Sequence, residues 1–274
     1  MNNNRKHLFI PDSQVAPGVP IDYLRWIGQY IVDKQPDVVI HAGDFADMPS
    51  LSYYDKGKKA MENRRIWADI DAVHHAWDVL NAPLEEYNQR MARNHEKRYY
   101  PEKHITLGNH EERILRAVEA NAQLDGLLGI ENLQLDRYGW QVHEFLKVVE
   151  IDGVQYAHFF ANPLSGKPWG GQIINRIYKV GGSFTMGHVQ TKELGEIHYA
   201  DGHVERGIVA GACYMHDEDY KGPQGNNHWR GILMKHEVKD GDYDLMEVSL
   251  NYLCQKYEGM SLDEYEPKLF AGKR

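Results

Sequence analysis

Short apolar runs alternate with helical patterns along the first part of the chain. Residues 7–11 form an apolar run, and residues 21–35 repeat their apolar side chains near the helical period of about 3.6 residues. Residues 36–44 then form a β-branched run that stops at a glycine, which is typical of a buried strand. This order of strand, helix and strand predicts a βαβ unit with parallel strands.

The next segment has a helical character. Residues 50–101 contain no convincing strand pattern and are predicted to be helical, with Pro83 either breaking a helix or starting one. A strand is predicted over residues 103–108 and a helix over residues 111–121. The first half of the chain is therefore predicted to be α/β.

The second half is dominated by strands joined by tight turns. Asp-Gly pairs between alternating runs predict hairpins, and they lie at residues 152–153, 201–202 and 240–241. A further strand is predicted over residues 183–190. The tail from residue 251 is polar and rich in tyrosine, and no role is assigned to it.

Composition narrows the class of protein. Hydrophobic residues make up 42% and charged residues 26%, which is ordinary for a globular chain of 274 residues. The net charge of −9 argues against strong non-specific binding to nucleic acid. No run approaches the length of a membrane span and the N-terminus lacks the apolar segment of a signal peptide, so we expect a cytoplasmic protein without membrane contact. Cys213 and Cys254 are predicted to be reduced packing residues.

Polar side chains gather where the predicted strands end: Asp12 with Gln14, Asp44, Asn109 with His110, His158, and His188 with Gln190. In open sheets with parallel strands, sites form beyond the carboxyl ends of the strands. Asp, Asn, Gln and His are also the side chains that bind divalent metals through oxygen or nitrogen. Such a set could hold two metals that activate a water and clamp phosphoryl oxygens.

Each of these residues also has a purely structural interpretation. Asp12 could cap the following helix, and Asp44 could belong to an ordinary turn. Asn109 could be a helix N-cap, with Glu111 in the favourable first turn, and His158 could be a core histidine. Taken singly the structural interpretations are favoured; taken in order along the chain, the residues favour a metal site.

The order of the motifs resembles that of the calcineurin-like metallophosphoesterase superfamily, D-x-H, G-D-x-x-D, G-N-H-[ED], a lone H and G-H-x-H. This chain has D-x-Q at 12–14, GDxxD at 43–47, GNHE at 108–111, His158 and GHxQ at 187–190. The resemblance implies an α/β fold, namely a four-layer α/β/β/α sandwich of two mixed β-sheets flanked by helices. We expect one domain over residues 1–274, with a helical insertion or cap over approximately residues 48–101.

The resemblance also implies metal ligands. Asp44 would bridge two divalent ions, Asp12 would bind the first ion, and the second ion would be held by Asn109, His158 and His188. Gln14 and Gln190 stand where the family has histidines that bind the first ion.

These two glutamines decide which metal is expected. If both bind, the first site is nearly all oxygen and suits Mn²⁺ or Mg²⁺; if neither binds, the first site is weak. We therefore expect a tighter second site and manganese as the working ion, with Mg²⁺, Fe and Zn²⁺ as alternatives.

Other roles follow from the same resemblance. His110 would face the scissile phosphate as a general acid or as a stabiliser of developing charge. Asp47 and Glu111 would orient the loops. Arg113 is either a phosphate contact or a charge on a helix surface.

The segment between Asp44 and Asn109 is the best indication of a substrate. It holds basic residues at 56–59 and 63–65, together with Tyr53, Tyr54, Trp67 and Trp77. Basic and aromatic residues together can hold phosphates and stack on bases. The alternative is an amphipathic helical pair with both tryptophans in the core. His228 opens a late strand and is a weak candidate for the cleft.

The leading hypothesis is a hydrolase, a metal-dependent phosphoesterase that cleaves a phosphodiester or nucleotide-type phosphoester, the substrate being a nucleotide or a nucleic-acid end. The first alternative is a metal-binding scaffold of the same fold with weak or no turnover. The second is a protein phosphatase. Fold and metals do not select among these substrates.

Overall fold

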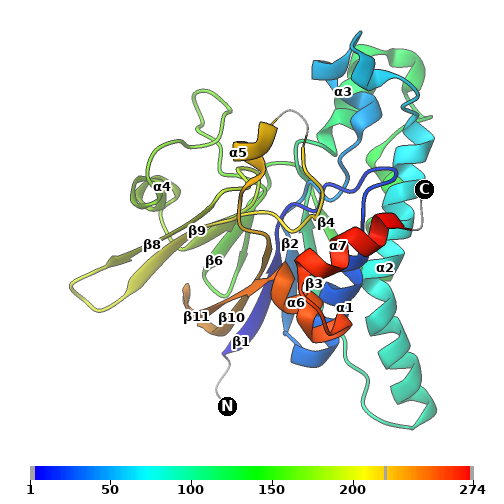
Figure 1. The fold of residues 1–274 in the computed structure, drawn as a ribbon. Helices are drawn as coiled ribbons and strands as arrows, with labels where there is room; N and C mark the ends of the chain where they lie inside the picture. Colours follow the sequence, from blue (N-terminus) through cyan, green and yellow to red (C-terminus); the bar gives the residue numbers. More distant parts are fainter. Residues whose placement is uncertain (1–3, 219–220, 272–274) are drawn as a thin grey trace.

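The computed structural model describes residues 4–218 and 221–271 (Figure 1). One sheet has the strand order β11-β10-β1-β2-β3-β4. Its strands are β1 (Arg5–Ile10), β2 (Val38–His41), β3 (Glu102–Thr106), β4 (Gln141–His143), β10 (Gly231–Lys239) and β11 (Asp242–Ser249). The neighbours from β1 to β4 are parallel, whereas β10 pairs antiparallel with β1 and β11, so this sheet is mixed.

The second sheet has the order β5-β6-β7-β9-β8 and is mixed as well. Its strands are β5 (Val149–Ile151), β6 (Val154–Ala157), β7 (Phe184–Met186), β8 (Lys192–His198) and β9 (Val204–Ala210). The hairpin predictions are confirmed, since β5–β6, β8–β9 and β10–β11 are antiparallel pairs joined by the Asp-Gly turns. At the first turn Asp152 and Gly153 both have positive φ, 51° and 80°, which favours this residue pair.

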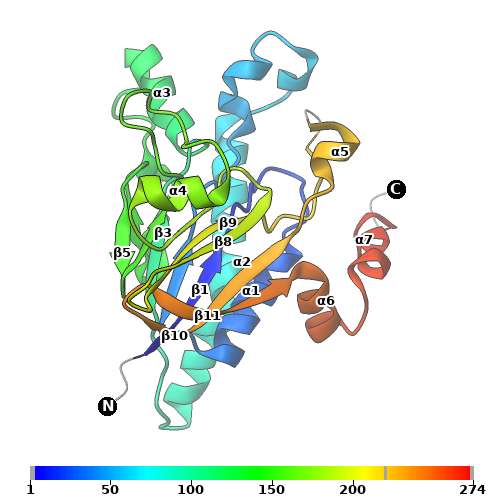
Figure 2. The same cartoon turned by 90° about the vertical axis from the view of Figure 1, so that its left-hand side faces the viewer.

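Helices cover the outer faces of both sheets (Figures 1 and 2). The helices of the described residues are α1 (Asp22–Lys34), α2 (Ile66–Arg93), α3 (Glu112–Ala120), α4 (Ile173–Val180), α5 (Gly222–Asn226), α6 (Leu250–Glu258) and α7 (Leu262–Ala271), of which α3 and α5 lie beyond the strand ends. Short 3₁₀ turns lie at Pro49–Leu51, Tyr53–Asp55, Lys59–Met61, Ala122–Leu124, Ile130–Leu133 and Arg137–Gly139.

The alternation of side chains along β1 explains the layers. Leu8 and Ile10 pack in the cluster formed with α1 and α2, whereas Phe9 packs in the cluster between the two sheets. On the far side of the second sheet, Ile177 of α4 packs with Phe184. The expected four-layer arrangement of two mixed sheets flanked by helices is therefore confirmed.

The prediction for Pro83 is wrong, because α2 continues through this proline. Helix α1 packs on the same turn at Gly28, where an added Cβ would lie 2.3 Å from the Leu80 carbonyl oxygen and 2.9 Å from the Pro83 ring. Close packing of the two helices thus holds a turn that local propensity disfavours. The tail also forms helices, and Tyr265 of α7 contacts Trp26 of α1 with 5.2 Å between ring centroids.

Both cysteines are buried and free, as predicted. Among the described residues, no helix is long and apolar enough to cross a membrane.

The loops that follow β2 and β3 are joined by one carboxylate. Glu111 is fully buried. Its Oε2 accepts hydrogen bonds from the backbone N–H groups of Asp44 at 3.0 Å and Gly108 at 2.8 Å, and its Oε1 accepts one from Ala46 at 2.9 Å. Glycine is required at 108, where a Cβ would lie 2.0 Å from Oδ1 of Asp44. Glu111 therefore fixes the two loops relative to each other.

A polar chain links the two sheets. Lys235 is fully buried and donates hydrogen bonds to Thr185 Oγ1 at 2.5 Å and to the Tyr156 hydroxyl at 3.2 Å. The same hydroxyl lies 2.8 Å from Nδ1 of His7, whose Nε2 lies 2.8 Å from Asp152 Oδ2. Because the Asp152 carboxylate can only accept, neutral His7 donates from Nε2 to Asp152, and its Nδ1 accepts from the Tyr156 hydroxyl, whose oxygen accepts from Lys235.

We predict that Glu111→Gln lowers the free energy of unfolding by about 2–5 kcal/mol. The substitution replaces one of the two carboxylate oxygens by an N–H₂ group, which cannot accept a hydrogen bond. At least one of the backbone N–H groups would then face another donor in a buried position. Urea denaturation measures this, with Glu112→Gln as the matched control on the more exposed neighbour. An equal, small loss in both variants would contradict the clamping role of Glu111.

We also predict a pH dependence that arises from His7. Burial lowers the pKa of His7 from 6.5 to about 4. The unfolded chain therefore binds more protons between these values, and the free energy of unfolding falls as pH drops from 6.5 to 4. His7→Gln should remove up to about 3 kcal/mol of this loss. Denaturant titrations at several pH values compare the two proteins, and parallel profiles would refute the prediction.

Candidate functional site

Four predicted metal ligands meet at the carboxyl ends of strands from both sheets. Ligand atoms of Asp44, His158 and His188 all lie within 4.8 Å of one another. His158 Nε2 lies 3.0 Å from Asn109 Oδ1, 3.2 Å from His188 Nδ1 and 3.4 Å from Asp44 Oδ2. Asp44 and Asn109 follow β2 and β3 of the first sheet, whereas His158 and His188 follow β6 and β7 of the second.

The histidines are held in a form that can bind a metal. His158 is fully buried, and its Nδ1 lies 2.9 Å from the carbonyl oxygen of Ala42. Donation from Nδ1 to this carbonyl leaves a lone pair on Nε2, the atom that faces Asp44 and Asn109. Burial and the neighbouring His158 lower the pKa of His188 to about 4, so its imidazole is neutral at pH 7.

The first ligand set lies beside the second. Asp12 is fully buried, and its Oδ1 accepts a hydrogen bond from the backbone N–H of His188 at 3.0 Å. Burial raises the pKa of Asp12 to about 6, so a nearby cation would relieve the cost of its charge. A Cβ at Gly187 would lie 2.2 Å from Asp12 Oδ1, so only glycine allows this approach.

The two glutamines of this set are in different situations. Gln14 has a φ of 44° and is 1% exposed, and neither atom of its amide has a hydrogen-bond partner among the described residues. Gln190, by contrast, accepts a hydrogen bond from the Tyr214 hydroxyl at Oε1 over 2.8 Å. A buried amide without hydrogen-bond partners destabilises the fold unless a ligand satisfies it. The oxygen of Gln14, together with the ligand atoms of the Asp, Asn and His side chains, therefore fits a divalent cation.

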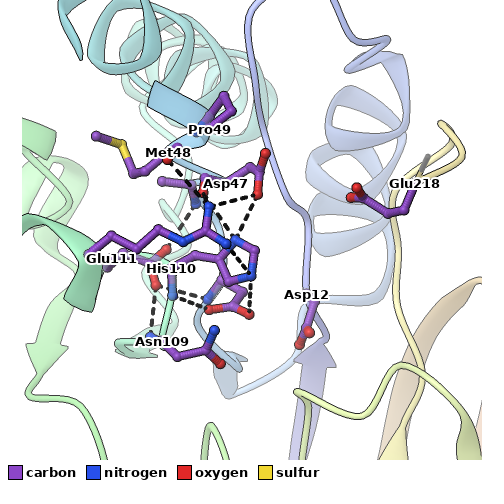
Figure 3. Close-up of polar contacts among 12 residues, drawn as sticks. Asp12, Asp47, Met48, Pro49, Asn109, His110, Glu111 and Glu218 are labelled. Carbon is purple, nitrogen blue, oxygen red and sulfur yellow. Dashed lines mark hydrogen bonds and ion pairs between the residues drawn. The ribbon is translucent and has the colours of Figure 1, made fainter. Parts of the chain in front are cut away.

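His110 lies beside this cluster, with its ring fixed by Asp47 (Figure 3). Nδ1 is 2.7 Å from Asp47 Oδ1 and 3.0 Å from the Asp47 carbonyl oxygen, and Nε2 is 3.7 Å from Asp44 Oδ2. Burial alone would lower the pKa of His110, but the Asp44 and Asp47 carboxylates raise it to about 9. These two carboxylates therefore favour the protonated form of His110.

Arg113 belongs to the same network and is not a free surface charge. It donates to the carbonyl oxygens of Asp47 at 2.7 Å and Met48 at 3.3 Å, and its Nη2 lies 3.3 Å from His110 Nε2. It also lines the cleft described below.

The ligands open into a cleft of about 990 Å³. Its walls come from residues 16–19, from residues 49–69, which belong to the expected insertion, and from residues 216–218 together with Lys221. Tyr54, Lys58 and Arg65 line this wall. Trp77 is a core residue with no exposure, whereas Trp67 is 60% exposed and lies outside the lining.

Residues after β9 complete the cleft and were missed in the sequence. His216, Glu218 and Lys221 line the wall, and Glu218 lies across the cleft from His110 (Figure 3). The dense run of Tyr, His, Asp, Glu and Lys after a strand end is the only signal that could have found them. His228 is not among the lining residues; its ring contacts Tyr214, with 5.7 Å between centroids.

Comparisons with known proteins give a family. The model of the calcineurin-like phosphoesterase family matches residues 6–217. One solved crystal structure is 13% identical with a TM-score of 0.39, over 90% of this chain and 100% of that chain. The crystal structure of a conserved uncharacterized protein from Streptococcus pneumoniae TIGR4, titled a predicted phosphoesterase, is 10% identical with a TM-score of 0.30, over 89% of this chain and 98% of that chain.

The search of curated proteins found no match. The TM-scores are below 0.5, so the assignment rests on the family model, which spans most of the chain and confirms the resemblance found in the motifs. The protein belongs to the calcineurin-like phosphoesterase family.

Proposed function

We propose that this protein is a metal-dependent phosphoesterase that hydrolyses a phosphodiester or a nucleotide-type phosphoester. Membership of the family implies metal-dependent phosphoester hydrolysis in general. The observation that carries the proposal is the convergence of Asp44, Asn109, His158 and His188 beside His110 in one open cleft.

Two divalent ions would be held by this chain, with Mn²⁺ as the expected ion. Asp44, Asn109, His158 and His188 would hold the second ion, and Asp12, Gln14 and Asp44 would contribute oxygens to the first. Bound ions would supply an activated water and polarise the phosphoryl oxygens. The second set is richer in imidazole and therefore expected to bind more tightly.

His110 would act on the leaving group. Oδ1 of Asp47 accepts a hydrogen bond from Nδ1–H, so the ring presents Nε2 to the cleft next to Asp44. From this atom a proton can pass to the departing oxygen, or remain and stabilise its charge. Asp47 positions the ring, Arg113 donates to the carbonyl oxygen of Asp47, and Glu111 holds the loop on which His110 lies.

The cleft wall formed by the insertion supports a nucleotide-type substrate. Lys58 and Arg65 carry positive charge, and Tyr54 is 81% exposed and available for stacking. Arg64 has a structural task instead, since it donates to Asp55 Oδ2 at 2.7 Å and to the Pro49 carbonyl oxygen at 2.9 Å.

We predict that the protein with Mn²⁺ hydrolyses bis-p-nitrophenyl phosphate, and that His110→Ala lowers kcat by about 10²–10⁴-fold with metal content unchanged, since the proton donor is lost. His95→Ala, on an exposed residue, is the matched control. If neither this diester, p-nitrophenyl phosphate nor nucleotides are turned over with metal, the protein is a metal-binding scaffold.

We further predict unequal metal affinities. After dialysis against metal-free buffer, mass spectrometry should find one retained Mn²⁺ per chain, and His158→Ala should lose it because the second set then lacks an imidazole. Two zinc ions retained with equal affinity would contradict this expectation.

A further inference from the structure

Gln190 is held by a chain of hydrogen bonds that begins at Lys221 in the wall of the cleft. The ammonium of Lys221 lies 2.9 Å from the Tyr214 hydroxyl, which lies 2.8 Å from Oε1 of Gln190. On its other side, Nε2 of Gln190 lies 3.5 Å from Oδ2 of Asp12, a long contact. Tyr214 is fully buried, and Gln190 is 5% exposed.

The chemistry of the groups fixes the direction of this chain. An ammonium group has only donors, so the Tyr214 oxygen must accept from Lys221. The hydroxyl proton is then directed to an acceptor, and the amide of Gln190 offers one only at its oxygen. The amide oxygen therefore points away from Asp12, and the N–H₂ group points toward it.

We propose that Lys221 and Tyr214 are positioning residues that hold Gln190 as a hydrogen-bond donor to Asp12 and prevent it from acting as a metal ligand. The inference rests on the proposed function, because it concerns how the first of two ions would be held. The first ion would then depend on Asp12, Gln14 and Asp44.

The contrast with Gln14 supports this division. Both atoms of the Gln14 amide are buried without a hydrogen-bond partner among the described residues, so its oxygen is available to an ion. The oxygen of Gln190 is already satisfied by Tyr214. Both glutamines stand where the family has a histidine that binds the first ion, yet their roles differ. Gln14 would be a ligand, and Gln190 would donate a hydrogen bond to the Asp12 carboxylate.

The position of Lys221 adds an electrostatic consequence. Its positive charge lies one hydroxyl and one amide away from Asp12, on the side of the first ligand set. A fixed positive charge there repels a cation at the first ligand set. Binding of the first ion is therefore weakened both by the loss of one ligand and by this repulsion.

Isothermal titration of the full chain with Mn²⁺ tests the proposal through binding, without reference to activity. Gln14→Ala removes a ligand and should lower the affinity for the first ion by about 10–100-fold, whereas Gln190→Ala should change this affinity by less than about threefold. Tyr214→Phe should raise the affinity for the first ion about threefold or more, because the Gln190 amide can then turn its oxygen to the metal.

A double variant isolates the mechanism. In the Gln190→Ala background, Tyr214→Phe should have no effect on the first ion, since there is no amide left to turn. Affinity for the second ion, held by Asn109, His158 and His188, serves in every variant as the measure of an intact fold. If Tyr214→Phe does not fold, Lys221→Met with and without Gln190→Ala replaces it. Loss of the charge should tighten binding of the first ion in both backgrounds; a larger tightening when Gln190 is present supports the proposal, and an equal tightening overturns it.

The opposite results are distinct. Equal weakening of the first ion by Gln14→Ala and Gln190→Ala would overturn the inference while leaving the proposed function intact. The same holds if Tyr214→Phe folds and leaves the first ion unchanged. If the wild-type chain binds no Mn²⁺ at its second set, the proposed function fails, and this inference fails with it.

Discussion

The carboxylate of Glu111 joins the ends of β2 and β3 by accepting hydrogen bonds from three backbone N–H groups in a fully buried position. Asp44 and His110 lie on the two loops that it joins, and they are further linked by a hydrogen bond of 2.9 Å from the His110 N–H to Asp44 Oδ1. Because buried carboxylates are stable only when their oxygens are satisfied, the loops cannot separate without stranding a charge. The position of the proton donor relative to the candidate metal ligands depends on this contact.

Much of the fold follows from local chemistry in the sequence. The Asp-Gly turns and the alternating runs predicted the hairpins, and β-branched runs that stop at glycine predicted β2 and β3. Pro83 was misjudged because packing of α1 at Gly28, distant in sequence, stabilises the turn around it. Strand β4 was not predicted, because only one of its three residues, Gln141–His143, is apolar and it has no Asp-Gly turn beside it.

The candidate site could also be predicted in part from the sequence. The strand ends could be ordered from the motifs, and the structure brings Asp12, Asp44, Asn109, His158 and His188 together. The wall formed by His216, Glu218 and Lys221 was not predicted, because only the path of the chain between β9 and β10 brings these residues to the cleft. The partner of Gln190 was hidden for the same reason: Tyr214 lies 24 residues away and has no motif of its own.

The link between the two sheets has a consequence for the molecule as a whole. Lys235, Tyr156 and His7 connect the sheets through hydrogen bonds inside the core, and Tyr156 lies on β6 two residues before His158. The candidate ligands for the second ion come from both sheets, two from each. An ion held there would act as a second cross-link between the sheets, so that separation of the two sheets would be resisted by the ion as well as by the hydrogen bonds. Occupancy by metal would thus be coupled to the stability of the sandwich, and ion-free protein would keep only the hydrogen-bonded link.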